Sequence, residues 1–142
     1  MKNRKVLIVE DEEVIRKVLR LSLRKWGFEV EEAEDGMKAL RKLEEGQYHL
    51  MICDIMMPNM DGWDLMKRVR EAKKTRDIRI IALTGKNKDA DMFKGYELGV
   101  NYYMTKPFTR AQLQYGIQLA LGESTESGPA IDLSEEFAKE DS

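Results

Sequence analysis

The chain has 142 residues, about the length of one domain, of which 42% are hydrophobic and 35% charged. Its net charge of −2 divides into 23 bases and 19 acids in residues 1–122 and one base and seven acids in residues 123–142. The bases form no single stripe, which argues against direct nucleic-acid binding. With no apolar run near the roughly 20 residues of a membrane span, no signal peptide and a single cysteine, we expect a cytoplasmic protein without disulfides or zinc.

Short apolar runs alternate with longer amphipathic ones along the chain. Lys5–Val9 is aliphatic and too short for a helix, which is typical of a buried strand. Glu12–Trp26 mixes aliphatic side chains with Arg and Lys, which predicts an amphipathic helix that ends at Gly27. The alternation continues with expected strands at Phe28–Ala33, Leu50–Asp54, Ile78–Thr84 and Asn101–Thr105, and expected helices at Gly36–Glu45, Met60–Lys74, Asp89–Leu98 and Thr109–Leu121.

Five strand–helix units in this order predict an α/β fold with a parallel sheet covered on both faces. Right-handed crossovers favour a doubly wound, flavodoxin-like (βα)5 domain with strand order 2-1-3-4-5, spanning residues 1–122. From Gly122 the composition changes, and GESTESGPA is typical of a linker. We expect residues 123–142 to be an acidic tail that is disordered or holds one short helix.

Four of the five expected strands deliver polar side chains to the same edge of the sheet. The first ends in Glu10, Asp11 and Glu12, and the third ends in Asp54. At an effective dielectric constant near 20, two like charges about 4 Å apart repel by roughly 4 kcal/mol. Such a cluster either holds protons or binds a cation, and a small number of oxygen ligands with room for water favours Mg²⁺ over an enclosed Ca²⁺.

The fourth and fifth strands complete this arrangement. Thr84 adds a hydroxyl group and Lys106 a fixed positive charge. Metal, ammonium and hydroxyl together can cradle the three oxygens of a phosphoryl group. Asp54, the most central carboxylate, would then be the nucleophile, and its product would be an acyl phosphate.

The motifs LIVEDEE, ICDIMMPNMDG, IIALTG and YYMTKPF resemble, in order and spacing, the receiver domain of response regulators over about residues 3–122. The resemblance implies that Asp54 accepts a phosphoryl group from the phosphohistidine of a sensor histidine kinase or phosphotransfer protein, or from a small acyl phosphate. It implies Mg²⁺, with Mn²⁺ as a substitute, bound by Glu10, Asp11, Asp54 and the backbone carbonyl of Met56. The first acid departs from the pattern, because Glu10 stands where Asp is commoner.

The resemblance also implies a switch instead of a turnover enzyme. Thr84 and Lys106 match the hydroxyl and lysine positions, and the Lys106–Pro107 bond is expected to be cis. Thr84 would approach the phosphoryl group and Tyr103 would rotate inward, changing the face formed by the fourth helix, fifth strand and fifth helix (α4-β5-α5), which contacts a downstream protein. Because neither Met56 nor Lys86 is suited to orient water, we expect slow self-dephosphorylation.

Two other phosphate-handling motifs do not fit the sequence. Haloacid-dehalogenase-type phosphatases need an Asp-x-Asp motif after the first strand, and a P-loop would need a glycine at Ile80, so neither fits. Two readings of the receiver remain open beside a stand-alone regulator. The chain could be the N-terminal receiver of a longer transcription factor or output enzyme, cut in its linker, or a pseudo-receiver that acts by binding alone.

Overall fold

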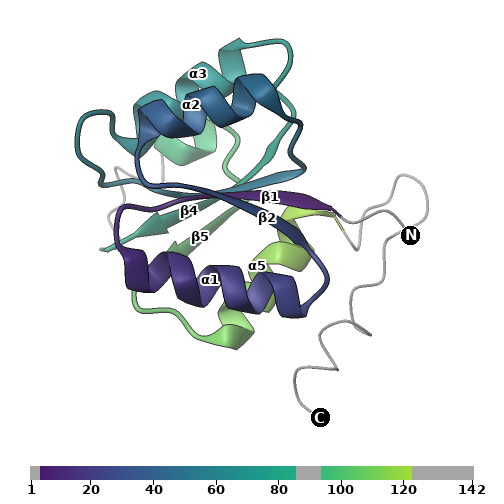
Figure 1. Cartoon of the computed structure of the whole chain (residues 1–142). Coiled ribbons are helices and arrows are strands. Elements are labelled where there is room, and N and C mark those ends of the chain that lie inside the picture. Colours follow the sequence, from purple (N-terminus) through teal and green to yellow (C-terminus); the bar gives the residue numbers. More distant parts are fainter. Residues whose placement is uncertain (1–3, 86–93, 123–142) are drawn as a thin grey trace.

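The computed structural model describes residues 4–85 and 94–122. Its centre is a five-stranded parallel sheet in the order β2-β1-β3-β4-β5, so the predicted α/β topology is confirmed. Figure 1 shows α2 and α3 on one face of this sheet and α1 and α5 on the other. The strands are β1 Lys5–Val9, β2 Glu29–Ala33, β3 Leu50–Asp54, β4 Arg79–Thr84 and β5 Tyr102–Thr105, and the helices are α1 Glu13–Lys25, α2 Gly36–Glu45, α3 Gly62–Glu71 and α5 Arg110–Ala120.

Outside two helices, every predicted bound equals the observed one or differs from it by one residue. Those two helices need comment. For the helix expected at Asp89–Leu98, residues 94–97 are helical and residues 86–93 lie outside the described part of the chain. The helix expected at Met60–Lys74 was predicted too long, because α3 ends at Glu71. None of the helices in the described part is both long and apolar enough to span a membrane.

Side-chain donors explain the early end of α3. The Thr75 hydroxyl donates to the carbonyl of Val69 at 2.8 Å. The guanidinium of Arg70 donates to four further carbonyls, those of Arg76, Ile78, Leu98 and Gly99. The Thr75 bond takes a carbonyl that a continued helix would use, and the Arg70 bonds hold the chain beyond α3 in a non-helical path. The amphipathic pattern ran on past Glu71, so periodicity alone extended the helix too far.

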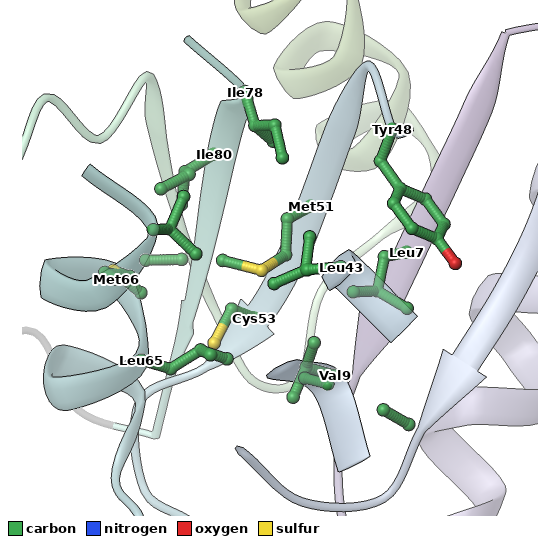
Figure 2. Packing of buried hydrophobic residues seen from close by; sticks show 14 of the residues in the cluster. Leu7, Val9, Leu43, Tyr48, Met51, Cys53, Leu65, Met66, Ile78 and Ile80 are labelled. Atoms are coloured by element: carbon green, nitrogen blue, oxygen red, sulfur yellow. The ribbon is translucent and has the colours of Figure 1, made fainter. Parts of the chain in front are cut away.

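The core forms two layers that the sheet separates. Along β1, Val6 and Ile8 face the layer under α1 and α5, whereas Leu7 and Val9 face the layer under α2 and α3, as strand alternation requires. Figure 2 shows this second layer, where side chains from β1, β3 and β4 meet those of α2 and α3. Cys53 belongs to it and is fully buried.

Strand β5 directs two adjacent tyrosines to opposite faces of the sheet. Tyr102 packs in the layer with α5, edge-to-face with Tyr115 at a centroid distance of 5.6 Å and against Gly116. Tyr103 packs against the other layer, with its hydroxyl at Gly95. A Cβ atom at either glycine would overlap the facing tyrosine ring. Each tyrosine therefore occupies a space that only glycine leaves open.

Candidate functional site

The carboxyl edge of the sheet, where the strands end, brings the predicted acids together. β1 and β3 are neighbours, with Val9 paired to Cys53, so the residues that follow each of them lie side by side. Glu10 is 0% exposed and Asp54 is 2% exposed, whereas Asp11 is exposed. Ligand oxygens of these three carboxylates all lie within 4.8 Å of one another. The expected acidic cluster therefore exists as a compact, mostly buried group.

Lys106 supplies the positive charge at the centre of this group. Its backbone N–H donates to the carbonyl of Thr84 at 2.8 Å, which places it directly beyond the end of β4, and its bond to Pro107 is cis. Its Nζ lies 2.8 Å from Glu10 Oε1 and 3.0 Å from Asp54 Oδ2. It also lies 3.2 Å from Glu12 Oε2. One ammonium thus contacts three carboxylates, and the cluster keeps an excess of negative charge.

Burial and pairing shift the pKa values of these groups. Burial raises the pKa of Glu10 to about 7, although hydrogen bonds from Lys106 and from the Glu12 backbone oppose the shift. Burial likewise raises the pKa of Asp54, again against the pull of Lys106. Burial alone would lower the pKa of Lys106, but its bonds to Glu10 and Asp54 outweigh that effect and raise it. The lysine stays charged, and the acids are crowded.

The backbone that carries the first acids is held by Arg16. Its guanidinium donates to the carbonyl of Glu10 at 2.9 Å and to that of Asp11 at 3.2 Å. The same side chain pairs with Glu32 of β2 at 3.3 Å. The Glu12 N–H donates to Glu10 Oε2 at 3.0 Å. These bonds fix the turn between β1 and α1.

The loop after β3 folds back over the end of that strand. The Met56 N–H donates to Asp54 Oδ1 at 3.1 Å, while the Met56 side chain is 75% exposed. The Gly62 N–H donates to the carbonyl of Ile55 at 2.8 Å. A Cβ atom at Gly62 would overlap the backbone oxygen of Asp54 and lie 2.7 Å from the Cα of Ile55. Glycine at the start of α3 is what allows this close approach.

The structure thus gathers most of the residues singled out from the sequence. Thr84 is buried at the end of β4, where it pairs with Thr105. Tyr103 lies further back on β5, opposite Ala82, and faces the layer of α2 and α3. The roles assigned to these residues stay predictions.

Two contacts at the site were missed in the sequence. Glu12 was recognised as part of an acidic run but not as a partner of Lys106, a contact 94 positions apart in the chain. Arg16 was regarded only as one of the bases on an amphipathic helix. Its position one helical turn after Glu12, beside the buried acids, was the one signal available.

The donor set fits a divalent cation. Carboxylate oxygens are the ligands that hard cations prefer, and three of them converge here around a surplus of negative charge. Because Asp11 is exposed while Glu10 and Asp54 are buried, the cluster opens on one side, where water or a phosphoryl oxygen could complete the coordination. The cluster could therefore hold a metal ion.

The comparisons with known proteins agree with this geometry. Residues 6–118 match the family model of the response regulator receiver domain, so the chain belongs to that family, the signalling switches of two-component systems. It is 35% identical over 131 residues to the alkaline phosphatase synthesis transcriptional regulatory protein PhoP of Bacillus subtilis, covering 92% of this chain and 54% of PhoP. It is 36% identical over 114 residues to the chemotaxis protein CheY-3 of Vibrio cholerae, covering 80% of this chain and 88% of CheY-3.

Length separates these relatives. The chain spans about half of PhoP, and likewise 50% of the transcriptional regulatory protein ResD of Bacillus subtilis, to which it is 35% identical over 87% of its own length. Among solved structures, Vibrio cholerae CheY4 superposes with a TM-score of 0.81 at 32% identity, over 84% of this chain and all of that one. The receiver domain of the sensor histidine kinase PA1611 of Pseudomonas aeruginosa, which holds magnesium in its active-site cleft, superposes with a TM-score of 0.77 at 33% identity, over 85% and 99%.

Proposed function

We propose that this chain accepts a phosphoryl group on Asp54 in a Mg²⁺-dependent reaction. The donor is the phosphohistidine of a sensor histidine kinase or phosphotransfer protein, or a small acyl phosphate. The observation that carries the proposal is the position of Asp54, a 2% exposed carboxylate whose Oδ2 lies 3.0 Å from Lys106 within the acidic cluster. The magnesium-bound receiver domain of PA1611 supports the choice of Mg²⁺. Mn²⁺ would act as a substitute.

Each residue of the cluster has a role in the proposed reaction. Glu10, Asp11, Asp54 and the backbone carbonyl of Met56 would hold Mg²⁺, which neutralises charge on the transferring group. An Asp54 carboxylate oxygen attacks phosphorus, the bond from phosphorus to the donor imidazole nitrogen breaks, and that nitrogen keeps the electron pair. Lys106 exchanges part of its contact with the carboxylates for a phosphoryl oxygen.

The switch would act through Thr84 and Tyr103. Thr84 is buried one position after Leu83, the residue that pairs with Asp54 across β3 and β4, so it lies close enough for a small shift to reach the phosphoryl group. Tyr103 is half-buried, with its hydroxyl at Gly95, and any inward rotation would change the helix at 94–97. The α4-β5-α5 face would then change its affinity for a downstream protein. Acetyl phosphate should therefore shift amide signals on β5 and α5; unchanged signals there would reject this output face.

The proposal covers a switch and not a turnover enzyme, with residues 1–122 as the receiver and 123–142 as a tail. We expect slow hydrolysis of the phosphoryl group on Asp54, because the exposed Met56 side chain is not suited to orient water. Lys86, the other residue on which this expectation depends, lies outside the described residues. The same chemistry serves a stand-alone regulator of the length of CheY-3 or the N-terminal receiver of a longer regulator such as PhoP or ResD.

The test is incubation of the chain with acetyl phosphate and MgCl₂, followed by intact mass measurement. The wild type should gain one phosphoryl group, and Asp54→Asn or addition of EDTA should abolish the gain. Asp64→Asn is the matched control, because Asp64 is an exposed acid on the first turn of α3 and should leave phosphorylation unchanged. No gain in the wild type, with either acetyl phosphate or a phosphorylated kinase, would reject the proposal in favour of a pseudo-receiver.

A further inference from the structure

The amino edge of the sheet, where the strands begin, carries a group of cations that phosphoryl chemistry does not use. A cavity of about 420 Å³ opens there, lined by Arg4, Lys74 and Arg79 together with Leu121. A second cavity of about 300 Å³ adjoins it, shares Arg79 and Asp77, and adds Arg70 and Arg76. We refer to Arg4, Arg70, Lys74, Arg76 and Arg79 as the amino-edge cations.

The residues that line the two cavities include few acids. Asp77 is the only acid among the described residues that line the two cavities. The Arg4 guanidinium makes no hydrogen bond or ion pair within residues 4–85 and 94–122, and burial lowers its pKa. Lys74 donates to a backbone carbonyl, that of Glu44, at 2.5 Å. The residues that line these two cavities thus carry five positive charges and one negative charge.

The chain itself contains a segment of opposite charge that begins at this edge. Helices between parallel strands run antiparallel to them, so α5 ends where the strands begin, and Leu121 lines the larger cavity. In Figure 1 the end of α5 lies on the same side of the molecule as the start of β1. The next 20 residues, 123–142, carry seven acids and one base, a net charge of −6.

We propose that the acidic segment 123–142 binds in cis to the amino-edge cations, with Arg4, Lys74 and Arg79 as its main contacts. A chain of 20 residues can span at most roughly 70 Å, which is ample because the segment starts at the rim of the cavity. Tethering gives the segment a millimolar effective concentration at the cations, so weak ion pairs suffice. The contact lies on the edge opposite Asp54 and leaves the acidic cluster open.

The experiment places a nitroxide spin label on the segment of the full chain through Ser134→Cys. Cys53 is fully buried, so the reagent modifies the new thiol alone. At low salt, the label should reduce the amide signal intensities of residues around Arg4, Lys74 and Arg79 and spare those around Asp11 and Thr105. Raising NaCl to about 0.5 M should restore the signals, because exposed ion pairs are screened.

Position 134 is 12 residues beyond residue 122, so tethering alone keeps the label near the end of α5. Variants must therefore separate binding from proximity. The triple change Arg4→Gln, Lys74→Gln and Arg79→Gln should restore the signals. A control triple change removes the same amount of charge from exposed positions on α1, α2 and α3, namely Lys17→Gln, Arg41→Gln and Lys67→Gln. The control should not restore the signals. Equal signal loss in the wild type and the amino-edge variant would overturn the proposal.

Two further arms keep the test decisive. The triple change Asp132→Asn, Glu135→Gln and Glu136→Gln halves the net charge of the segment from −6 to −3 without touching the folded domain. It should restore most of the signal intensity even where the amino-edge variant is unstable. Contact between molecules is detected in a mixture of two chains. One chain carries the spin label at natural isotope abundance, and the other is ¹⁵N-enriched and carries no spin label. Signal loss in that mixture would show binding in trans and overturn the assignment in cis.

Discussion

The two edges of the sheet are opposites in charge and in construction. At the carboxyl edge, Glu10 and Asp54 surround one cation, Lys106, and are buried. At the amino edge, the two cavities are lined by five cations and one acid, Asp77, and three of the five cations are exposed. Buried like charges store repulsion that a ligand can relieve, whereas exposed ones are screened by water. We therefore expect substitutions at the carboxyl edge to change folding and chemistry, and those at the amino edge to change little but binding.

The largest expected difference concerns two glycines. Gly62→Ala should lower the free energy of unfolding by about 3 kcal/mol, because the new methyl overlaps the Asp54 backbone. At the amino edge, the Cβ atom of Gly46→Ala would meet the flexible end of Lys5 at 3.3 Å, the Tyr48 ring at 3.5 Å and the Lys42 carbonyl oxygen at 3.7 Å. Gly46→Ala should therefore change stability by less than about 0.5 kcal/mol. Urea unfolding of both variants measures the contrast, and equal losses would contradict it.

The next comparison removes one lysine from each edge. Lys106→Met leaves Glu10 and Asp54 buried without their cation. It should lower the free energy of unfolding by about 2 kcal/mol at pH 8 in metal-free protein. This cost is smaller than that of breaking a fully buried ion pair, because Lys106 is 17% exposed. Lys74→Met at the amino edge should cost less than about 0.5 kcal/mol. Thermal melts with EDTA test both. A Lys106→Met protein as stable as the Lys74→Met protein would mean that the acids tolerate the loss of their cation.

Unfolding at different pH values tests how the charge on Glu10 affects stability. Its pKa rises from 4.5 to about 7 on folding, so its stabilising contribution is present below pH 4.5 and is lost as the pH rises through 7. Glu10→Gln should therefore stabilise metal-free protein by about 2 kcal/mol at pH 8 and leave it unchanged at pH 4. Denaturant unfolding at the two pH values decides; a pH-independent effect would point to packing instead of charge.

The smallest effect is that of the metal. At a concentration ten times its dissociation constant, Mg²⁺ should raise the unfolding free energy by about 1.4 kcal/mol. Asp11→Asn should reduce this gain, whereas Lys74→Met should preserve it. Melting temperatures with MgCl₂ and with EDTA provide the measurement. A gain retained in Asp11→Asn would place the ion elsewhere.

The sequence predicted the carboxyl edge well because topology alone assembles it. Once Leu50–Asp54 is recognised as a buried strand beside Lys5–Val9, the residues after each must meet, whatever the side chains between them do. The predicted end of α3 was wrong for the opposite reason. The helix ends where Thr75 and Arg70 make side-chain contacts, and hydrophobic periodicity does not reveal such contacts.

The amino edge was not foreseen. Its cations come from separate segments, and each looked like an ordinary surface charge. Arg4 precedes β1, Arg70 lies in α3, Lys74 and Arg76 lie between α3 and β4, and Arg79 begins β4. Only the fold shows that they converge beside the end of α5. The contact between Glu12 and Lys106 escaped notice for the same reason, because a pair 94 positions apart leaves no local pattern.

The two tyrosines of β5 have a consequence for how this lineage can diverge. Tyr102 fills the space left by Gly116, and Tyr103 fills that left by Gly95. Among descendants that keep this packing, each glycine and its tyrosine should be inherited as a pair. A lineage that gains a side chain at either glycine should first, or at the same step, have exchanged the facing tyrosine for a smaller residue.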